Sequence, residues 1–427
     1  MSSPGRRVAV VGGGWAGVAA AVEAVSQGHQ VTLFETAAQL GGRARSVDSA
    51  GRLLDNGQHI LIGAYRDTLQ LIRRVGVDVD AALLRQPLRL QYPDGSGLCL
   101  PAGRPVPAFV RGVLRYRGWP WAARGAVLLQ AGAWLAQGFR CPAHLTVERL
   151  VHRLPRVVRD ELIEPLCVAA LNTPAARASA QVFLRVLKDA LFGGPGCADL
   201  LLPRVPLRHL LPQPAGAWLQ SRGAELRLGE RVQSLLADGA QWRLNGHCFD
   251  AVVLACTAAE AARLTAAVAP GWSAAAGGFE YEPIVTVYLA CEGARLPQPM
   301  TALRTGPQAP AQFLFDHGAL GGPAGQFACV VSGAREWVAQ GLAACAEAAV
   351  AQALSAFPAG TWPATPRVVA TWAEKRATFL CSPQLERPGS QVARGLIAAG
   401  DYIEGPYPAT LEGAVRSGLA AARQLAP

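Results

Sequence analysis

Apolar runs separated by glycine-rich and polar stretches predict a strand, a helix and a second strand at the start of the chain. Val8–Val11 is uninterrupted by polar residues, as expected for a parallel strand buried on both faces. Small residues from Val18 to Gln27 favour a helix that ends at Gly28. Gln30–Phe34 is a second apolar run, so a β-α-β unit is expected.

Strand and helix patterns return far along the chain. Gly223–Val232 alternates like a strand, and Asp250–Cys256 and Gly395–Asp401 each contain a short apolar run typical of a buried strand. Thr410–Ala422 then predicts a closing helix. These segments are expected to join the N-terminal unit in one sheet.

The chain has 427 residues, of which 51% are hydrophobic, so two or three structural units are expected. No apolar window reaches the roughly 18 residues that a bilayer span needs, because charges such as Glu260 and Arg263 interrupt the runs. The net charge of +10 comes from scattered arginines, with Lys188 and Lys375 the only lysines. Nothing resembles a recognition helix or a stacking platform, so nucleic acid is not an expected partner.

The ten cysteines are widely spaced and form no CxxC pair. This argues against a disulfide framework, a zinc site or an iron–sulfur cluster, and no metal site is expected. The N-terminus shows no charged-then-apolar leader. A cytoplasmic protein with reduced thiols is therefore expected.

A glycine motif follows the first strand directly. Gly12, Gly14 and Gly17 form GxGxxG between a strand and a helix, the setting of a dinucleotide-binding turn. Gly12 would allow the tight turn, Gly14 the close approach of a pyrophosphate, and Gly17 the packing of helix on strand. The N-terminus of the helix that follows would offer free N–H groups to phosphate, and Trp15 and Ala16 within the turn are expected to contact the cofactor.

Glu35 ends the second strand, where an acid can accept both hydroxyls of an adenosine ribose. An acid at this position disfavours a 2′-phosphate, so NADP is not expected. On these features alone, NAD and FAD both remain open.

Leu40–Ser46 contains paired glycines and two arginines, including Gly42 and Arg43, which can wrap a diphosphate. This segment resembles the GG-R signature of the amine oxidase and phytoene desaturase superfamily, and the resemblance implies non-covalent FAD. In that superfamily an aspartate matching Asp401, after Gly400, bonds the ribityl chain. The helix that begins at Thr410 and Leu411 would point its positive end at the flavin. By the same resemblance, the backbone of Val232 would meet adenine.

Three longer segments resemble the hydroxysqualene dehydroxylase family, a squalene-associated, FAD-dependent, desaturase-like group. They are Leu54–Tyr65 with its DNGQH run, Glu164–Thr173, and Gly400–Ala414 with its GPYPATLEGA ending. The likeness extends over nearly the whole chain. It implies that reduced flavin delivers hydride to a hydroxylated C30 isoprenoid, water leaves and squalene forms, with upstream enzymes of squalene synthesis as further candidate partners.

Such a reaction needs a group that protonates the leaving oxygen. Asp55, His59 and Lys375 are the candidates. In relatives the segment that matches Asp55 and His59 lies beside the flavin, and some amine oxidases have a lysine near the reactive nitrogen of the flavin. Each has an alternative interpretation: Asp55 as a turn or helix cap, His59 as a hydrogen-bonded structural residue, and Lys375 as a surface residue with a buried stem.

The expected fold class is α/β. A Rossmann-like FAD-binding domain is predicted from residues 1–77, 212–256 and 387–427, and an α+β substrate domain from 78–211 and 257–386. Val106–Arg140 mixes arginines with aromatic residues on predicted helices broken at Pro120. Such a segment suits the surface of an anionic membrane, on the inner face of the plasma membrane, but an ordinary amphipathic core helix explains it nearly as well.

Two other functions share these cofactor motifs. One is a desaturase or amine oxidase that runs the flavin in the oxidising direction, for which Trp372 and Tyr402 could form an aromatic cage. The other is a non-catalytic FAD-bearing protein that carries a polyprenyl lipid and needs no proton donor.

Overall fold

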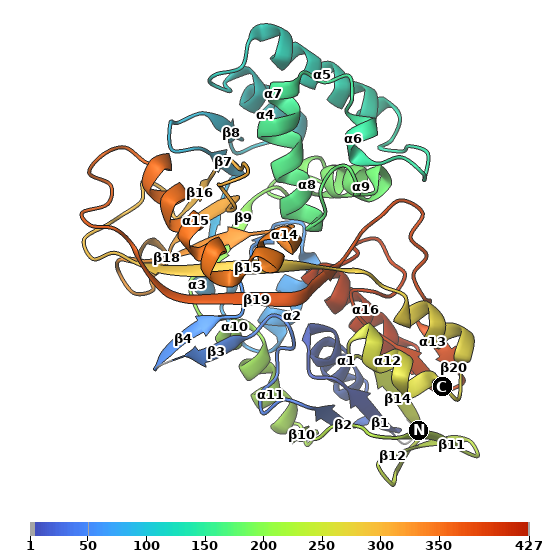
Figure 1. The fold of residues 1–427 in the computed structure, drawn as a ribbon. Coiled ribbons are helices and arrows are strands. Elements are labelled where there is room, and N and C mark those ends of the chain that lie inside the picture. Colours follow the sequence, from blue (N-terminus) through green and yellow to red (C-terminus); the bar gives the residue numbers. More distant parts are fainter. Residues whose placement is uncertain (1–4, 50, 426–427) are drawn as a thin grey trace.

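The computed structural model describes residues 5–49 and 51–425 (Figure 1). A six-stranded sheet forms the end of the molecule that carries the N-terminus. Its first five strands are parallel and the sixth is antiparallel. In spatial order they are β10 (Glu225–Leu228), β2 (Gln30–Glu35), β1 (Arg7–Val11), β14 (Ala251–Leu254), β21 (Leu396–Ala398) and β20 (Gln391–Ala393).

Both faces of this sheet are covered, which is why its central strands are apolar throughout. One hydrophobic cluster joins the sheet to α1 (Trp15–Ser26), α11 (Pro212–Gln220) and α16 (Leu411–Arg423). A second cluster covers the other face, and it includes residues of the meander β11–β13 and of α12. These elements are β11 (Leu235–Asp238), β12 (Gln241–Leu244), β13 (His247–Phe249) and α12 (Ala258–Thr265), which α13 (Pro270–Gly277) follows.

A five-stranded antiparallel sheet forms the middle of the molecule, and its long strands β15 and β19 cross most of the width in Figure 1. A hydrophobic cluster packs one of its faces against α15 (Leu342–Ala356). The other face contributes to a cluster shared with the helices beyond it. The strands are β16 (Met300–Ala302), β17 (Phe313–Asp316), β18 (Gln326–Val331), β15 (Tyr281–Ala290) and β19 (Arg367–Phe379), and α14 (Arg335–Gln340) precedes α15.

Helices occupy the end opposite the N-terminal sheet (Figure 1). A π-helical turn at Arg159–Ile163 runs directly into α8. The helices are α4 (Pro105–Leu114), α5 (Trp121–Ala136), α6 (Val147–Leu150), α7 (Arg156–Val158), α8 (Glu164–Leu171) and α9 (Ala180–Leu191).

Short elements connect these regions. The sheet β5-β9-β6 joins β5 (Leu61–Ile62) to β9 (Leu200–Pro203) and β6 (Leu83–Gln86), so it crosses the boundary expected near residue 77. The remaining elements are β3 (Ser46–Ser49), β4 (Arg52–Asp55), α2 (Arg66–Arg74), α3 (Val79–Ala82), β7 (Arg89–Gln91), β8 (Gly97–Cys99), α10 (Leu207–Leu210) and a 3-10 turn at Gly318–Leu320.

The structure confirms the expected α/β class, with every strand of the parallel sheet drawn from the segments assigned to cofactor binding. The predicted strand at Gly223–Val232 is shorter than expected, because β10 ends at Leu228 and the chain then turns at Gly229 with a positive φ of 74°. In residues 5–49 and 51–425, no helix is both long and apolar enough to cross a bilayer.

Candidate flavin site and active site

The glycine turn has the geometry that its sequence predicts. Gly12 has a φ of 106°, and a Cβ there would lie 2.6 Å from the Ala255 carbonyl oxygen. A Cβ at Gly17 would lie 1.8 Å from the Gly12 oxygen, because α1 packs closely on the turn. At Gly14 the nearest atom to a Cβ would be the Gly42 Cα, at 3.8 Å. Gly12 and Gly17 are therefore required by packing, whereas Gly14 has space for a neighbour.

The N-terminus of α1 has no side-chain cap, since Gly14 occupies that position. The first-turn N–H groups of an uncapped helix are available to an anion. Trp15 and Ala16 are both buried, and the Trp15 indole N–H donates to the Ala44 carbonyl at 3.0 Å. That bond holds the Leu40–Ser46 segment beside the start of α1.

The same segment touches the turn through its backbone. The Gly41 N–H donates to the Gly13 carbonyl at 2.8 Å, and Gly14 and Gly41 form an isolated parallel bridge. Gly42 has a φ of 59°, and a Cβ there would lie 3.0 Å from the Gly14 Cα. The two glycine motifs predicted to hold one diphosphate thus lie against each other.

Glu35 lies at the end of β2, close to the glycine turn. Its carboxylate accepts the Gly13 N–H at 2.6 Å and the Ala37 N–H at 2.8 Å. These bonds orient an acid beside the turn, where an adenosine ribose would be expected.

Val232 follows β10, whose residues pair with Thr32–Glu35. Its side chain is buried, and its carbonyl accepts an N–H of Arg263 at 2.7 Å. A carbonyl oxygen can accept two hydrogen bonds. The Val232 carbonyl therefore keeps one acceptor position beside Arg263, and this position and the Val232 N–H could both bond an adenine ring.

Arg43 and Asp401 form an ion pair at 2.6 Å between Nη2 and Oδ1. Arg43 also donates to the Ala377 carbonyl of β19 at 2.8 Å. Burial lowers the pKa of the Arg43 guanidinium, but Asp401, together with Tyr281 and Glu374, raises it by more, so this cation stays charged. One side chain thus links the N-terminal glycine segment, the C-terminal Gly-Asp turn and the central sheet.

The start of α16 lies just beyond Asp401. Ala409 donates its N–H to the Asp401 carbonyl at 3.2 Å, and the Thr410 hydroxyl caps the helix by accepting the Gly413 N–H at 2.9 Å. Leu411 is the first helical residue. The positive end of α16 therefore lies one short turn away from the Asp401 side chain.

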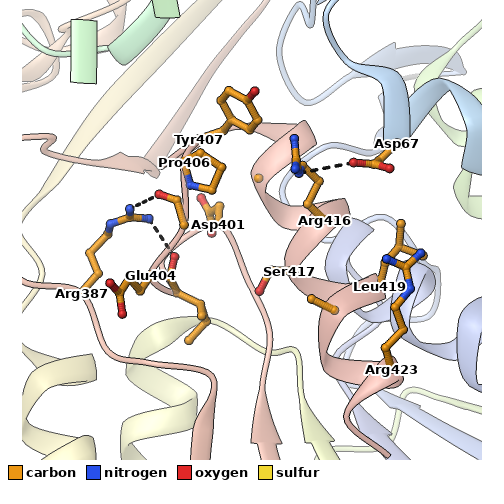
Figure 2. A pocket seen from close by; sticks show the side chains of 14 residues that line it. Asp67, Arg387, Asp401, Glu404, Pro406, Tyr407, Arg416, Ser417, Leu419 and Arg423 are labelled. Atoms are coloured by element: carbon orange, nitrogen blue, oxygen red, sulfur yellow. Dashed lines mark hydrogen bonds and ion pairs between the residues drawn. The ribbon is translucent and has the colours of Figure 1, made fainter. Parts of the chain in front are cut away.

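A pocket of about 270 Å³ opens between this turn and α16 (Figure 2). Arg387 donates to the carbonyls of Ile403 at 2.7 Å and of Gly405, which holds the turn closed on one side. Arg416 pairs with Asp67 at 3.3 Å on the other side. Asp401 lines this pocket and joins it to the cofactor segments.

Asp55 ends β4 and connects three elements. Its Oδ1 accepts the Ser46 hydroxyl at 2.6 Å and the Leu207 N–H at the start of α10 at 3.0 Å. Its carbonyl accepts the Tyr288 hydroxyl at 2.9 Å. Burial raises the pKa of the Asp55 carboxyl to about 6, although both side-chain hydrogen bonds lower it. These contacts favour the helix-cap interpretation over the catalytic one.

His59 lies beside Gly57, whose carbonyl is 2.9 Å from the His59 Nδ1. A carbonyl can only accept, so Nδ1 carries the hydrogen and the neutral ring leaves Nε2 as an acceptor. Burial lowers the pKa of His59, and the nearby Arg43 charge lowers it further, against the Gly57 contact, which raises it. His59 is therefore neutral at pH 7 and becomes a proton donor only under acidic conditions.

Lys375 is exposed on β19. The preceding residue, Glu374, accepts the Asn56 side-chain N–H at 3.1 Å. The pairing of β19 with β15 is irregular here, because Thr378 lies opposite Glu282 whereas Glu374 lies opposite Ile284. The exposure of Lys375 gives no support to the expectation that its amine lies near the flavin.

Asn56 and Glu374 were not among the expected site residues. Asn56 also donates to the Arg43 carbonyl at 3.3 Å, so the pair extends the polar cluster around Arg43. The sequence contains a signal for both, because Asn56 lies inside the DNGQH run and Glu374 is adjacent to Lys375.

Buried polar atoms without a hydrogen-bond partner among the described residues include Gln58 Oε1, Thr286 Oγ1, Trp372 Nε1 and Tyr402 Oη. Thr286 and Trp372 are paired across β15 and β19. A Cβ at Gly57 would lie 3.6 Å from His59 Cε1 and 3.8 Å from Thr286 Oγ1. Buried polar groups are normally hydrogen-bonded, so the Thr286 hydroxyl beside the Gly57 turn is available to a bound molecule.

These observations fit an FAD molecule. The two glycine motifs leave room at Gly14, an uncapped helix faces that room, an acid lies beside it, and Asp401 and α16 lie further along. Fold and site together define a dinucleotide-binding flavoprotein of the oxidoreductase type.

Comparison with known proteins identifies the family. The model of flavin containing amine oxidoreductases matches residues 15–426, so the chain belongs to that family and uses a flavin cofactor. A protein of Rhodopseudomonas palustris named hydroxysqualene dehydroxylase is 28% identical over 98% of this chain and 97% of its own. One of the same name from Sinorhizobium fredii is 30% identical over 54% of each chain. The structure of an oxidoreductase from Methanosarcina mazei shares the fold, with a TM-score of 0.71 and 15% sequence identity. The match covers 98% of this chain and 100% of that one.

Proposed function

We propose that this flavoprotein reductively removes the hydroxyl group of hydroxysqualene to form squalene. The observation that carries the proposal is the likeness, along the full length of both chains, to a protein named hydroxysqualene dehydroxylase. The DNGQH run and the GPYPATLEGA ending, both of which resemble this family, support the proposal.

The surroundings of the site suit an apolar substrate. A large hydrophobic cluster extends from β15 and β17 into α4–α9, and Trp372 and Ile284 of the long strands pack against it. These two residues lie on the face of the sheet that also presents Glu374 and Thr286. A hydrocarbon chain bound against this cluster could therefore place one polar end among the orphaned polar groups.

When bound, reduced FAD would supply the hydride for the carbon that loses its oxygen. The protein has to exclude water, orient the hydroxyl and provide a proton for it. We assign the hydroxyl contact to His59, because it lies beside the unpartnered Thr286 and Gly57 gives both of them room. The protonated form of His59 would donate the proton with which the hydroxyl leaves as water, and because the pKa of His59 is lowered by burial, this form becomes populated only as the pH falls.

The first alternative is oxidation of an apolar substrate by the same flavin. The aromatic cage expected of an amine oxidase has little support, because Trp372 and Tyr402 belong to separate hydrophobic clusters. A desaturase remains as the competing enzyme. The lipid-carrier hypothesis is opposed by the polar cluster around Arg43 and Glu374, which simple storage of a hydrocarbon does not require.

Incubation of the purified protein with hydroxysqualene and a chemical reductant, followed by gas chromatography, tests the proposal. Squalene should accumulate only when protein and reductant are both present. Conversion of a saturated isoprenoid bond by the oxidised protein, without squalene formation in the reducing arm, would instead identify a desaturase. Tight hydroxysqualene binding with no product in either arm would identify a carrier.

A further inference from the structure

Helix α5 is apolar on both of its sides. Its inner side is buried through Ala123, Val127, Ala131 and Trp134, which recur every three or four residues. Its outer side exposes Trp121 at 71%, Leu129 at 78% and Leu135 at 47%. The other exposed residues of the helix are small: Ala122, Gly132, Ala133 and Ala136. A helix facing water normally carries charges on its outer side, so this one is suited to being covered.

Neighbouring residues extend this surface. Val106 and Leu114 of α4 are 44% and 40% exposed, and Leu135 of α5 is 47% exposed. Together with Trp121 and Leu129 they account for five of the nine large hydrophobic side chains that are exposed in the described chain. We call these five residues the α4–α5 apolar surface.

The charge around this surface has one sign. No acidic residue lies between Asp94 and Glu148, a stretch that contains six arginines: Arg104, Arg111, Arg115, Arg117, Arg124 and Arg140. All except Arg124 are exposed, and none of the exposed five has a salt bridge or side-chain hydrogen bond in the residues described. Arg124 stacks over the Trp121 ring at 4.4 Å and bonds the Leu114 carbonyl at 2.7 Å.

Most aromatic residues of this segment stabilise the helical region and do not contribute to the α4–α5 apolar surface. Tyr116 and Trp119 stack at 3.7 Å and both donate to Glu161. Trp134 is buried on the inner side of α5. The basic-aromatic pattern expected at the surface therefore reduces to Trp121, while Tyr116, Trp119 and Trp134 hold the helical region together.

We propose that the α4–α5 apolar surface docks on an anionic lipid bilayer, with Trp121 and Leu129 entering the interface and the unpaired arginines meeting the lipid headgroups. The arginines supply the charge complementarity, because anionic headgroups attract basic side chains near the membrane surface. The helix would lie in the plane of the interface, as amphipathic surface helices do.

The shape of this region favours a bilayer over a protein partner. Helix α5 forms the outermost edge of the helical end in Figure 1, far from the N-terminal sheet. Along α5 the large side chains Trp121, Leu129 and Leu135 are separated mainly by Ala and Gly, which suits a fluid boundary better than a shaped groove. The proposal does not depend on which reaction the flavin catalyses.

Co-sedimentation with vesicles tests the proposal on the full-length flavoprotein. Phosphatidylcholine vesicles containing phosphatidylglycerol should retain the protein at low salt, while pure phosphatidylcholine should not. Arg115→Gln with Arg117→Gln should weaken binding by about thirtyfold, since each basic residue near such a surface contributes roughly fivefold. Trp121→Ser with Leu129→Ser should weaken it by at least about tenfold.

Matched controls lie on other exposed parts of the chain. Leu236→Ser removes a 56% exposed leucine of β11, and Arg73→Gln with Arg295→Gln removes two exposed arginines elsewhere. These variants should bind like the parent, and flavin absorbance and circular dichroism should show that all variants are folded. Equal losses in test and control variants would overturn the proposal. Absence of binding to anionic vesicles at low salt would also overturn it. The same holds if the protein does not bind vesicles but forms a dimer that dissociates when Trp121 and Leu129 are replaced.

Discussion

Arg43 and Asp401 meet at 2.6 Å although 358 positions separate them in the sequence. The pair joins the second glycine motif to the C-terminal turn that leads into α16. Because the Arg43 side chain also bonds a carbonyl of β19, it connects the cofactor segments to the central sheet. This contact places residues from both ends of the chain at one site.

Replacing Arg43 with Ala should weaken FAD binding by about tenfold or more, because the buried Asp401 carboxylate loses its partner. Fluorescence titration of the apoprotein with FAD measures this loss. Arg73→Ala, on the exposed side of α2, serves as the control and should titrate like the parent. Unchanged affinity in the Arg43 variant would show that the ion pair does not support the cofactor.

Two glycine substitutions should separate folding from cofactor binding. Gly12→Ala should destabilise the fold by about 3 kcal/mol, because its backbone has a φ of 106° and the new Cβ meets the Ala255 carbonyl. Gly14→Ala has an ordinary φ of −71° and open space, so the apoprotein should unfold at the parent's temperature while FAD affinity falls. Normal FAD binding in Gly14→Ala would place the pyrophosphate elsewhere.

Asp55 should make stability depend on pH. Its carboxyl titrates near 3.8 when unfolded and near 6 when folded, so the folded state binds its proton more tightly. The contribution of Asp55 to the free energy of unfolding is therefore fully present at low pH, and it is lost as the pH rises through about 6. Asp55→Asn should remove that loss and stabilise the protein by about 2 kcal/mol at pH 8, as measured by urea unfolding. Destabilisation at every pH would show that the carboxylate itself is needed.

His59 and Lys375 should differ in their effect on turnover. His59→Gln should retain FAD but lower squalene formation by about a hundredfold. The activity of the parent is expected to rise below pH 6.5, because the lowered pKa of His59 allows protonation of its ring only there. His59→Gln should remove this rise. Lys375→Ala should leave the rate unchanged, since the lysine side chain is exposed to solvent. Identical pH profiles for parent and His59→Gln would assign the proton to another group.

The cofactor half of the site was predictable because it depends on local rules. A strand, a GxGxxG turn and a helix follow one another directly, and Gly12, Gly14 and Gly17 each have the space or closeness that their positions imply. Arg43 and Asp401 were singled out separately by motif, but nothing in the sequence showed that they touch.

The catalytic half depends on contacts between distant segments, which a single sequence does not show. The sequence does not show that Asp55, a candidate acid, accepts hydrogen bonds from Ser46 at the start of β3 and from Leu207 at the start of α10. The contact between Glu374 and Asn56 depends on how β19 pairs with β15, and this pairing is not visible in the sequence. The orphaned hydroxyl of Thr286 could be recognised only once its neighbours were placed.

Anaerobic rapid mixing of the photoreduced protein with hydroxysqualene tests the central claim most directly. The account predicts that the flavin bands reappear after mixing and that one squalene forms for each flavin reoxidised. Flavin that stays reduced in the presence of bound hydroxysqualene, or that reoxidises without yielding squalene, would contradict it.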